Sequence, residues 1–416
     1  MDTSSSGRSR RSFLAMAGSS LAAGVVGPAA AAPTIATPTI RFPAIMGPTE
    51  PPGDIKPLPL EPGKRIGYAI VGIGHLTMEA IVPAFAKSQY SRITALVTGD
   101  RAKGLDLARS LGLPETAVYD YAGYERLADQ KDVDAVYIVL PNNMHLEYTV
   151  RAARIGKHVL CEKPMAIDAV ECQQMIDACD RAKKLLMIAY RQQYEPMNRA
   201  LGKMMRDGKL GTIKQILACN SQNEGDPGQW RHKRAMAGGG SLPDVGIYCL
   251  NATRFLSREE PTEVIAQIYT TPNDPRFREV EETVHFQLRY PSGLMAQCST
   301  SYGAHLSRFL RVNGTTGWAE MDPAFSYSGL KLRGSSLVDG VETAFEPNIH
   351  EADQFTKEID HMSACVATGT PPHTGGAEGL QDMKIIAAMY RAAETGRAVR
   401  LDPPPAPTRG PEPATS

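Results

Sequence analysis

The stretch Ile66-Gly67-Tyr68-Ala69-Ile70-Val71-Gly72-Ile73-Gly74-His75-Leu76-Thr77 decides the fold. Its first six residues form a mainly apolar run of strand length, and Gly72 and Gly74 follow at once. In such a turn the first glycine allows the tight bend and the second lets the backbone approach a pyrophosphate. A helix that begins there points its N-terminus at the phosphates. The stretch therefore predicts a dinucleotide-binding turn, with Thr77 in place of a third glycine.

The residues around this turn alternate between apolar runs of strand length and amphipathic segments of helix length. The runs lie at 66–71, 92–97, 134–140, 157–161 and 185–190. Such alternation indicates a parallel sheet with helices on both faces. We therefore predict an α/β protein whose residues 63–190 form a Rossmann-type, doubly wound domain that binds a dinucleotide.

The pattern changes after Arg191, where several apolar runs are separated only by turns. They lie at 213–220, 263–270, 283–289, 294–300 and 308–312, with helical segments at 196–206, 241–256, 351–367 and 377–396. Successive strands joined by turns pair antiparallel. Residues 191–402 are therefore predicted to form an α+β domain with an open, largely antiparallel sheet.

The N-terminus has the pattern of an export signal. Arg8-Ser9-Arg10-Arg11-Ser12-Phe13-Leu14 reads as a twin-arginine leader, which is an address recognised by a receptor. The apolar run from Phe13 to Val26 is 14 residues long, too short to span a membrane. We expect residues 1–32 to be a signal peptide, cleaved near Ala29–Ala32, that sends the folded protein to the periplasm.

Two further segments are rich in proline. Residues 33–62 contain nine prolines and should be extended, because proline lacks a backbone donor. They form either a flexible spacer or an arm that wraps a neighbouring subunit and covers the cofactor. The tail, residues 403–416, is predicted to be disordered.

Composition excludes several classes of function. Lys plus Arg and Asp plus Glu number 45 each, so no net charge favours nucleic acid or an anionic membrane. The seven cysteines form no CxxC pair, and most should be buried free thiols. The nine histidines form no HxH or HxxxH pair, so we expect no metal site.

The end of the second predicted strand should read the cofactor ribose. Thr98 and Gly99 stand there, and Arg101 and Lys103 follow closely. An NAD enzyme carries a carboxylate at this place, whereas a small hydroxyl with nearby cations suits a 2′-phosphate. Asp100 disagrees, but it lies beyond the strand end and can point away. The residues favour NADP.

Two stretches carry candidate catalytic groups. Cys161-Glu162-Lys163-Pro164 ends the predicted fifth strand, at the edge of the sheet where ligands bind. Asp244 and Tyr248, in the run Gly238–Tyr248, are four residues apart and share a helix face. Positive charge beside a tyrosine favours its ionised form, so Tyr248 could take a proton from a substrate hydroxyl. Alone, Lys163 could be a surface residue and Tyr248 a core residue.

In combination these stretches resemble the Gfo/Idh/MocA oxidoreductases, and within them the periplasmic glucose–fructose oxidoreductase branch. Further similar stretches are Asp134–Ile138, Tyr194–Arg199 and Gln229-Trp230-Arg231, and the resemblance covers roughly residues 63–400. Most of the wider family has histidine where this chain has Tyr248. His75 and Arg191-Gln192-Gln193 depart from the branch, which leaves the second sugar open: a ketose, or an aldose as in an aldose–aldose oxidoreductase.

The resemblance implies Lys163, Asp244 and Tyr248 as catalytic residues, a tightly bound NADP and oxidation of an aldose to a lactone. It also implies a homo-oligomer, with residues 191–402 as the domain for substrate binding and oligomerisation. For the cofactor site it implies Gly72, Gly74, His75, Leu76, Thr98, Gly99, Arg101, Lys103, Leu140, Asn142, His145, Glu162, Lys163, Tyr190, Arg191, Trp230 and Arg231. His145 follows the third apolar run and lies at the same edge of the sheet, so it is either a structural residue or one that faces the nicotinamide.

Three other functions remain open. An ordinary NAD(P)-dependent sugar dehydrogenase would exchange its cofactor in each turnover. An NAD-assisted glycosidase is disfavoured by Tyr248 in place of histidine and by the basic 2′-phosphate site. A non-catalytic protein that binds NADP or sugar would have no need for a proton acceptor.

Overall fold

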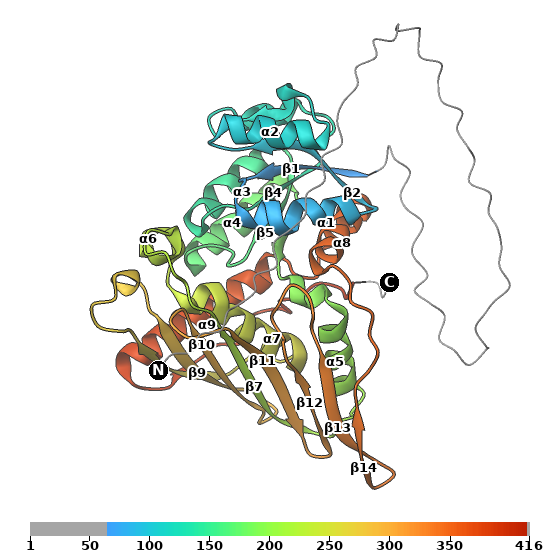
Figure 1. Ribbon diagram of the computed structural model, residues 1–416, viewed down its shortest axis with the longest axis vertical. Helices are drawn as coiled ribbons and strands as arrows, with labels where there is room; N and C mark the ends of the chain where they lie inside the picture. Colours follow the sequence, from blue (N-terminus) through green and yellow to red (C-terminus); the bar gives the residue numbers. More distant parts are fainter. Residues whose placement is uncertain (1–64, 414–416) are drawn as a thin grey trace, which may run out of the picture. The chain divides into compact units, whose positions relative to one another are not determined.

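The computed structural model describes residues 65–413 (Figure 1). The predicted signal peptide and the proline-rich arm, residues 1–62, therefore lie outside the described residues. Two sheets organise the described part of the chain, one on each side of the short helix η5 (Arg191–Tyr194) in the sequence.

Within residues 65–413 the first sheet has six parallel strands in the order β3-β2-β1-β4-β5-β6. The strands are β1 (Ile66–Val71), β2 (Ser91–Val97), β3 (Val118–Tyr119), β4 (Ala135–Ile138), β5 (His158–Glu162) and β6 (Leu186–Ala189). This is the strand order of a doubly wound dinucleotide-binding fold, so the predicted Rossmann-type sheet is confirmed.

Helices cover both faces of this sheet, as the alternating pattern predicted. They are η1 (Thr77–Ile81), α1 (Val82–Lys87), α2 (Arg101–Leu111), α3 (His145–Arg154) and α4 (Ala169–Ala182), with short turns η2 (Glu115–Ala117), η3 (Tyr124–Asp129) and η4 (Asn142–Met144). Helix α2 begins where the Asp100 side chain accepts a hydrogen bond from Lys103 N, and it ends at Gly112 with φ 69°. Such a cap and such a glycine are common helix ends.

The second sheet has nine described strands in the order β14-β13-β12-β11-β7-β10-β9-β8-β15. They are β7 (Ile213–Ser221), β8 (Glu263–Tyr269), β9 (Thr283–Arg289), β10 (Met295–Ser301), β11 (Ser307–Gly314), β12 (Gly317–Met321), β13 (Leu332–Val338), β14 (Val341–Phe345) and β15 (Val399–Arg400). Among these neighbours β7 and β10 pair parallel and the rest antiparallel, which confirms the predicted open, largely antiparallel sheet.

Helices pack on one face of this sheet. Helix α7 (Ile247–Ser257) contacts β7 and β10, and α9 (Gly376–Thr395) contacts β8 (Figure 1). The other helical segments are α5 (Pro196–Arg206), η6 (Trp230–His232), α6 (Arg234–Ala237), η7 (Leu242–Gly246), η8 (Pro275–Phe277) and α8 (Gln354–Thr368). Buried and exposed side chains alternate along β9 and through the first five residues of β8, as expected for strands with one covered face.

Helix α8 follows the second sheet in sequence but packs against the first. It contacts α1, β1 and β2, and Figure 1 shows it in orange beside the blue α1. Phe355, Ile359 and Met362 of α8 share a buried cluster with Tyr68 and Ile70 of β1. The segment after the second sheet thus completes the core of the Rossmann-type domain.

The prediction of a disordered tail is wrong for residues 403–413. Thr408 is buried and donates a hydrogen bond of 2.7 Å to Glu378 Oε2, and Arg409 Nη1 donates one of 3.0 Å to Glu378 Oε1. Composition did not reveal these contacts because their partners lie on a distant helix. Residues 414–416 lie outside the described part of the chain.

All seven cysteines are buried and have free thiols, as the sequence predicted. Among the described residues, no helix is both long and apolar enough to cross a membrane.

Candidate active site

The glycine turn after β1 has the predicted geometry. Gly72 adopts φ +101°, and a Cβ there would lie 2.3 Å from Val139 O, so another residue would be strained and would clash. A Cβ on Gly74 would meet no atom within 4 Å, which leaves open space beside the backbone. Thr77 donates a hydrogen bond of 2.8 Å to Gly72 O and braces the turn from the third-glycine position. The turn therefore has room for a phosphate group at Gly74.

The end of β2 presents two cations and no free carboxylate. Thr98 is buried and accepts a hydrogen bond from Asp100 N at 3.2 Å. The Asp100 carboxylate is used as the cap of α2 and accepts from Lys103 N at 3.1 Å. Gly99, Arg101 and Lys103 are exposed. These groups fit a 2′-phosphate, as the sequence analysis proposed for NADP.

The remaining candidates from the turn lie at the surface. His75 is nearly fully exposed and contacts Glu79 at 3.2 Å, while Leu76 is half-buried. Within the described part of the chain, neither side chain forms a hydrogen bond or ion pair with Glu162 or Lys163 at the end of β5.

Several predicted cofactor residues are instead buried beneath the carboxyl edge of the sheet, each with at most 8% of its surface exposed. They are Leu140, Asn142, His145, Glu162, Tyr190 and Arg191. Asn142 Nδ2 donates a hydrogen bond of 2.8 Å to Ala237 O, and this bond joins η4 to the end of α6. His145 is wholly buried, with Nε2 2.9 Å from Leu140 O and Nδ1 3.0 Å from Pro164 O. These contacts favour the structural role for His145.

Lys163 and Asp244 form the centre of the site. Lys163 Nζ donates hydrogen bonds of 2.9 Å to Asp244 Oδ1 and of 2.7 Å to Asp244 O. The Lys163 and Asp244 side chains are 10% and 16% exposed. Burial disfavours the Lys163 ammonium, but Asp244, together with Tyr248 and Glu162, outweighs this effect and raises the lysine pKa. Lys163 therefore stays protonated, and one of its three N–H donors remains for a substrate oxygen.

Asp244 accepts two further hydrogen bonds on its other oxygen. Arg231 Nε donates to Oδ2 at 3.1 Å, and Tyr302 OH donates to the same atom at 2.5 Å. Burial would raise the pKa of Asp244, but Lys163, Arg231 and the Tyr302 hydroxyl hold it well below its usual range. The carboxylate is therefore ionised and fixed in place. Its partner Tyr302 was not predicted.

Tyr248 lies beside this ion pair, and its ring is close to two cations. Lys163 Nζ is 4.7 Å from the ring centroid, and Arg191 Cζ is 4.8 Å from it. Asp244 and Tyr248 both reach Lys163, although their segment begins as the π-helix η7 and continues as α7. Such π-turns are frequent at functional sites. The structure thus brings together all three predicted catalytic residues.

Glu162 lies behind Lys163 and faces a second carboxyl group that sequence reasoning missed. Tyr137 OH donates 2.8 Å to Glu162 Oε1, and it lies 3.5 Å from Glu358 Oε1 of α8. Burial raises the pKa of both carboxyls, and for Glu358 the charge of Glu162 adds to the effect. No local motif points to Glu358, because it comes from a helix far along the chain.

Trp230 and Arg231 lie on η6, on the other side of Asp244 from Lys163. Arg231 Cζ is 4.6 Å from the Trp230 ring, and 34% of the Arg231 side chain is exposed. Arg231 therefore borders the site through Asp244, and Trp230 lies next to Arg231.

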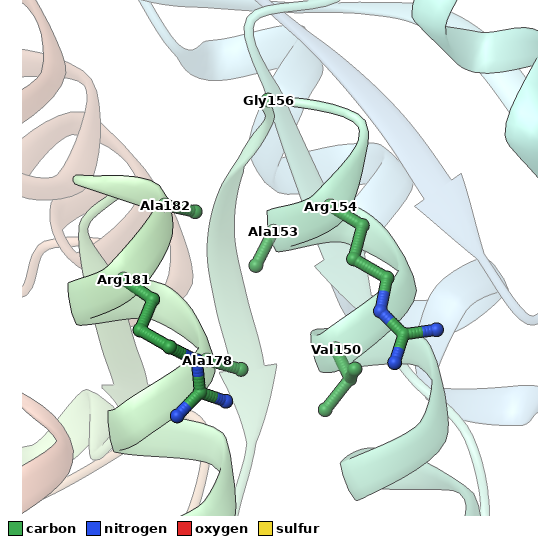
Figure 2. Close-up of a pocket in the computed structure, with 7 residues that line it drawn as sticks. All are labelled: Val150, Ala153, Arg154, Gly156, Ala178, Arg181 and Ala182. Atoms are coloured by element: carbon green, nitrogen blue, oxygen red, sulfur yellow. The ribbon is translucent and has the colours of Figure 1, made fainter.

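A separate surface pocket of about 460 Å³ lies between the ends of α3 and α4 (Figure 2). Its lining residues are Val150, Ala153, Arg154, Gly156, Ala178, Arg181 and Ala182. Because α3 and α4 end just before β5 and β6 begin, the pocket is at the opposite edge of the sheet from Lys163. It does not belong to the candidate active site.

Residues 66–190 match the model of an oxidoreductase family with an NAD-binding Rossmann fold, Gfo/Idh/MocA, and residues 198–320 match a Gfo/Idh/MocA C-terminal domain. The chain belongs to the Gfo/Idh/MocA oxidoreductase family. This family member is 34% identical over 345 residues to the D-xylose 1-dehydrogenase (NADP(+)) of Haloarcula marismortui, which covers 81% of this chain and 93% of the relative.

Solved structures give the same relationship. An aldose-aldose oxidoreductase from Caulobacter crescentus, complexed with glycerol, has a TM-score of 0.78 and 45% identity, over 81% of this chain and 100% of that one. The 3-ketoreductase KijD10 from Actinomadura kijaniata, in complex with NADP and TDP-benzene, has a TM-score of 0.70 and 23% identity, over 79% and 98%. The second comparison shows a shared fold.

Proposed function

We propose that this chain is a sugar oxidoreductase that oxidises an aldose to its lactone and passes the hydride to a second sugar, which becomes a polyol. The observation that carries the proposal is the Lys163–Asp244 ion pair beside the Tyr248 ring at the carboxyl end of β5. The similarity to an aldose-aldose oxidoreductase and to a D-xylose dehydrogenase supports sugars as the substrate class.

Lys163 would bind and orient the reacting hydroxyl of the sugar. Two of its N–H groups are held by Asp244, so the third has a fixed direction. A fixed ammonium next to an oxygen stabilises the negative charge that develops there in the transition state. Asp244 thus acts by holding the lysine, and Arg231 and Tyr302 act by holding Asp244.

Tyr248 would move the proton. It takes the proton of the C1 hydroxyl while the C1–H bond breaks, and it returns a proton to the carbonyl oxygen of the second sugar. The Lys163 and Arg191 cations beside its ring would stabilise negative charge that develops on the phenol oxygen during this exchange. One acid–base group serves both directions because the two steps are chemical reverses.

The residues present fit NADP, which when bound supplies the hydride acceptor and donor. Gly72 and Gly74 would hold its pyrophosphate, and Thr98, Arg101 and Lys103 its 2′-phosphate. We propose that the cofactor is retained through turnover and that the twin-arginine leader exports the loaded, folded protein to the periplasm. There it has no pool of free NADP to draw on. Fractionation of cells that produce the full chain tests the location.

One experiment distinguishes this function from that of an ordinary dehydrogenase with an exchangeable cofactor, which the D-xylose dehydrogenase relative favours. Protein purified without added cofactor should show the absorbance band of reduced nicotinamide after one aldose is added, and a second sugar should bleach it. Double-reciprocal plots with both sugars varied should give parallel lines. Intersecting lines, or a need for added NADP in every turnover, would instead show an ordinary dehydrogenase.

The role of Tyr248 is tested by Tyr248→Phe, which removes the hydroxyl and little volume. Turnover should fall by about 100- to 10,000-fold, since general acid–base catalysis contributes that much. The variant should still bind NADP, because the residues that fit the cofactor are unchanged. Near-normal turnover would make Tyr248 a packing residue.

We also propose a homo-oligomer, a dimer or a tetramer. Support comes from the face of the second sheet that the helices leave uncovered, where Ile265, Tyr269 and Met295 are exposed apolar side chains. Exposed apolar residues in one region mark protein–protein contacts. Sedimentation velocity of the purified protein tests this, and a monomer at micromolar concentration would contradict it.

A further inference from the structure

Arg191 is almost fully buried beneath the candidate active site, although it directly follows the first sheet in the chain. Only 3% of its surface is exposed. Its guanidinium donates 2.9 Å to Phe325 O and 3.3 Å to Ser326 O, and it also donates to Gln354 Oε1. Gln354 in turn donates to Ser326 O and Tyr327 O at 3.0 and 2.7 Å. Arg191 thus joins the loop 325–327 to the start of α8.

The same guanidinium lies close to three aromatic rings. Arg191 Cζ lies 4.8 Å from the centroid of Tyr248, 4.6 Å from that of Tyr327 and 5.6 Å from that of Phe355. A guanidinium can donate in its plane and stack on its faces at once, whereas a lysine ammonium cannot. The position therefore uses the particular shape of arginine.

We propose that Arg191 is a positioning residue for Tyr248 and not a ligand of the cofactor. It holds the Tyr248 ring beside Lys163 and adds a second positive charge next to the proton acceptor. This inference rests on the proposed function, because it assigns a role in that reaction. It also replaces the cofactor contact that the family resemblance implied for Arg191, which the burial of the side chain disfavours.

The charges around Tyr248 come from several elements. Lys163 approaches from the end of β5, Arg191 from η5, and the Tyr327 hydroxyl from the 325–327 loop. Two carboxyls, Glu162 and Glu358, interact with Arg191 from β5 and α8. Burial disfavours the Arg191 cation, yet neighbouring Tyr248 and Tyr327 raise its pKa, so it remains charged. Replacing it with a neutral residue removes one of the two cations that contact the Tyr248 ring.

Two substitutions separate the charge from the geometry. Arg191→Met should lower kcat by about 10- to 100-fold, as expected when a reacting group is misplaced by about 1 Å. It should change the KM for the sugar much less, and it should alter the pH dependence of kcat because the proton acceptor loses one of its two neighbouring cations. Arg191→Lys should lower kcat but leave the pH profile close to that of the unmodified protein.

Arg151→Met is a matched control. Arg151 of α3 also stacks on two rings, with Cζ 4.9 Å from the Tyr124 centroid and 5.0 Å from that of Tyr148, and it pairs with Glu125 and Glu147. It lies near the end of α3, away from Lys163. Its loss should lower the midpoint of thermal unfolding without moving kcat or the pH profile, which is the result expected of a purely structural arginine.

The decisive readouts are kcat, its pH profile and the NADP that each protein retains after purification, measured by absorbance. A lower kcat with a shifted pH profile and retained NADP supports the inference. Wild-type kcat and pH profile in Arg191→Met, or loss of NADP from it alone, overturns the inference while the proposed function stands. If Arg191→Met does not fold, the Lys variant decides: a kcat within about twofold of the unmodified protein overturns the inference. Absence of sugar turnover in the unmodified protein overturns the proposed function itself, and the inference with it.

Discussion

Single residues at the carboxyl edge show how local context changes the meaning of a side chain. Asp100 argues for NAD by its type, yet its carboxylate is engaged as the cap of α2. Arg101 and Lys103 lie on the same first turn, so they bring positive charge near Thr98. The basic character of this corner therefore depends on one aspartate being occupied elsewhere.

Cofactor preference can be tested at Thr98. Replacing Thr98 with Asp places a carboxylate at the strand end, where it would repel the 2′-phosphate that the two cations attract. We expect the preference for NADP over NAD to fall by at least about tenfold, which corresponds to ~1.4 kcal/mol. Binding of both cofactors to protein freed of nucleotide by mild unfolding and refolding measures it.

Thr98→Asn is the control for shape, since asparagine matches aspartate in size but has no charge. Both variants lose the hydrogen bond from Asp100 N to Thr98 Oγ1, but asparagine adds no charge. Thr98→Asn should therefore lower the affinity for NADP and for NAD to a similar extent. Unchanged NADP preference in Thr98→Asp would show that the ribose is read elsewhere.

The sequence predicted the catalytic residues whose positions are set by residues close to them in the chain. Lys163 ends a strand, and Asp244 and Tyr248 are four residues apart, so local pattern located all three. Tyr302 reaches Asp244 across 58 residues of chain, and Glu358 reaches Tyr137 across 221. No spacing rule covers such pairs, because only the packing of the strand ends and of α8 brings them together.

At the scale of elements, the same distinction separates strands and helices that were predicted from those that were missed. The runs at 66–71, 213–220 and 283–289 match β1, β7 and β9 closely because each has buried apolar residues at regular positions. Strand β14 was missed because four of its five residues are exposed. The helix α8 was predicted at about its observed length. Its apolar face, however, does not indicate which of the two sheets the helix packs against.

Helix α8 also carries a histidine whose neutral form the fold requires. His361 Nε2 lies 3.0 Å from His373 N and accepts its hydrogen. Burial, together with the charges of His373 and Arg199, lowers the pKa of His361 to about 4. A histidine whose pKa is lowered by folding adds stability above its unfolded pKa of about 6.5, and that stability is lost as the pH falls toward the folded value.

We therefore expect the free energy of unfolding to fall by up to about 3 kcal/mol through His361 between pH 6.5 and pH 4. His361→Gln keeps a hydrogen-bond acceptor but cannot titrate, so this part of the pH dependence should disappear. Urea unfolding at several pH values, followed by circular dichroism, measures the difference between the two proteins. Identical pH dependence would mean that His361 titrates normally in the folded protein.

Across the whole molecule, the C-terminal segment joins distant parts of the chain through one buried ion cluster. Arg254 of α7 is fully buried and pairs with Glu260, Glu378 and Asp382 at 2.7, 2.9 and 2.6 Å. Its excess of carboxylates is offset by Arg409 of the tail, which pairs with Glu378 at 3.0 Å. Composition suggested disorder here because proline-rich segments lack secondary structure, but ion pairs need none.

The tail should consequently stabilise the fold through the buried ion pair of Arg409 rather than through the surface ion pairs of Glu412. Arg409→Ala removes one of the positive charges that pair with the buried Glu378 carboxylate. Because a hydrogen bond to a charged group is worth about 1.5–3 kcal/mol, we expect the free energy of unfolding to fall by about that amount. Glu412→Ala is the matched control, because Glu412 is 38% exposed and its pairs with Arg199 and Arg258 lie at the surface. Such pairs contribute less than about 1 kcal/mol. Thermal and urea unfolding of both variants provide the measurement. Equal stability of Arg409→Ala and the unmodified protein would mean that the tail adds nothing to the fold, as its composition alone had suggested.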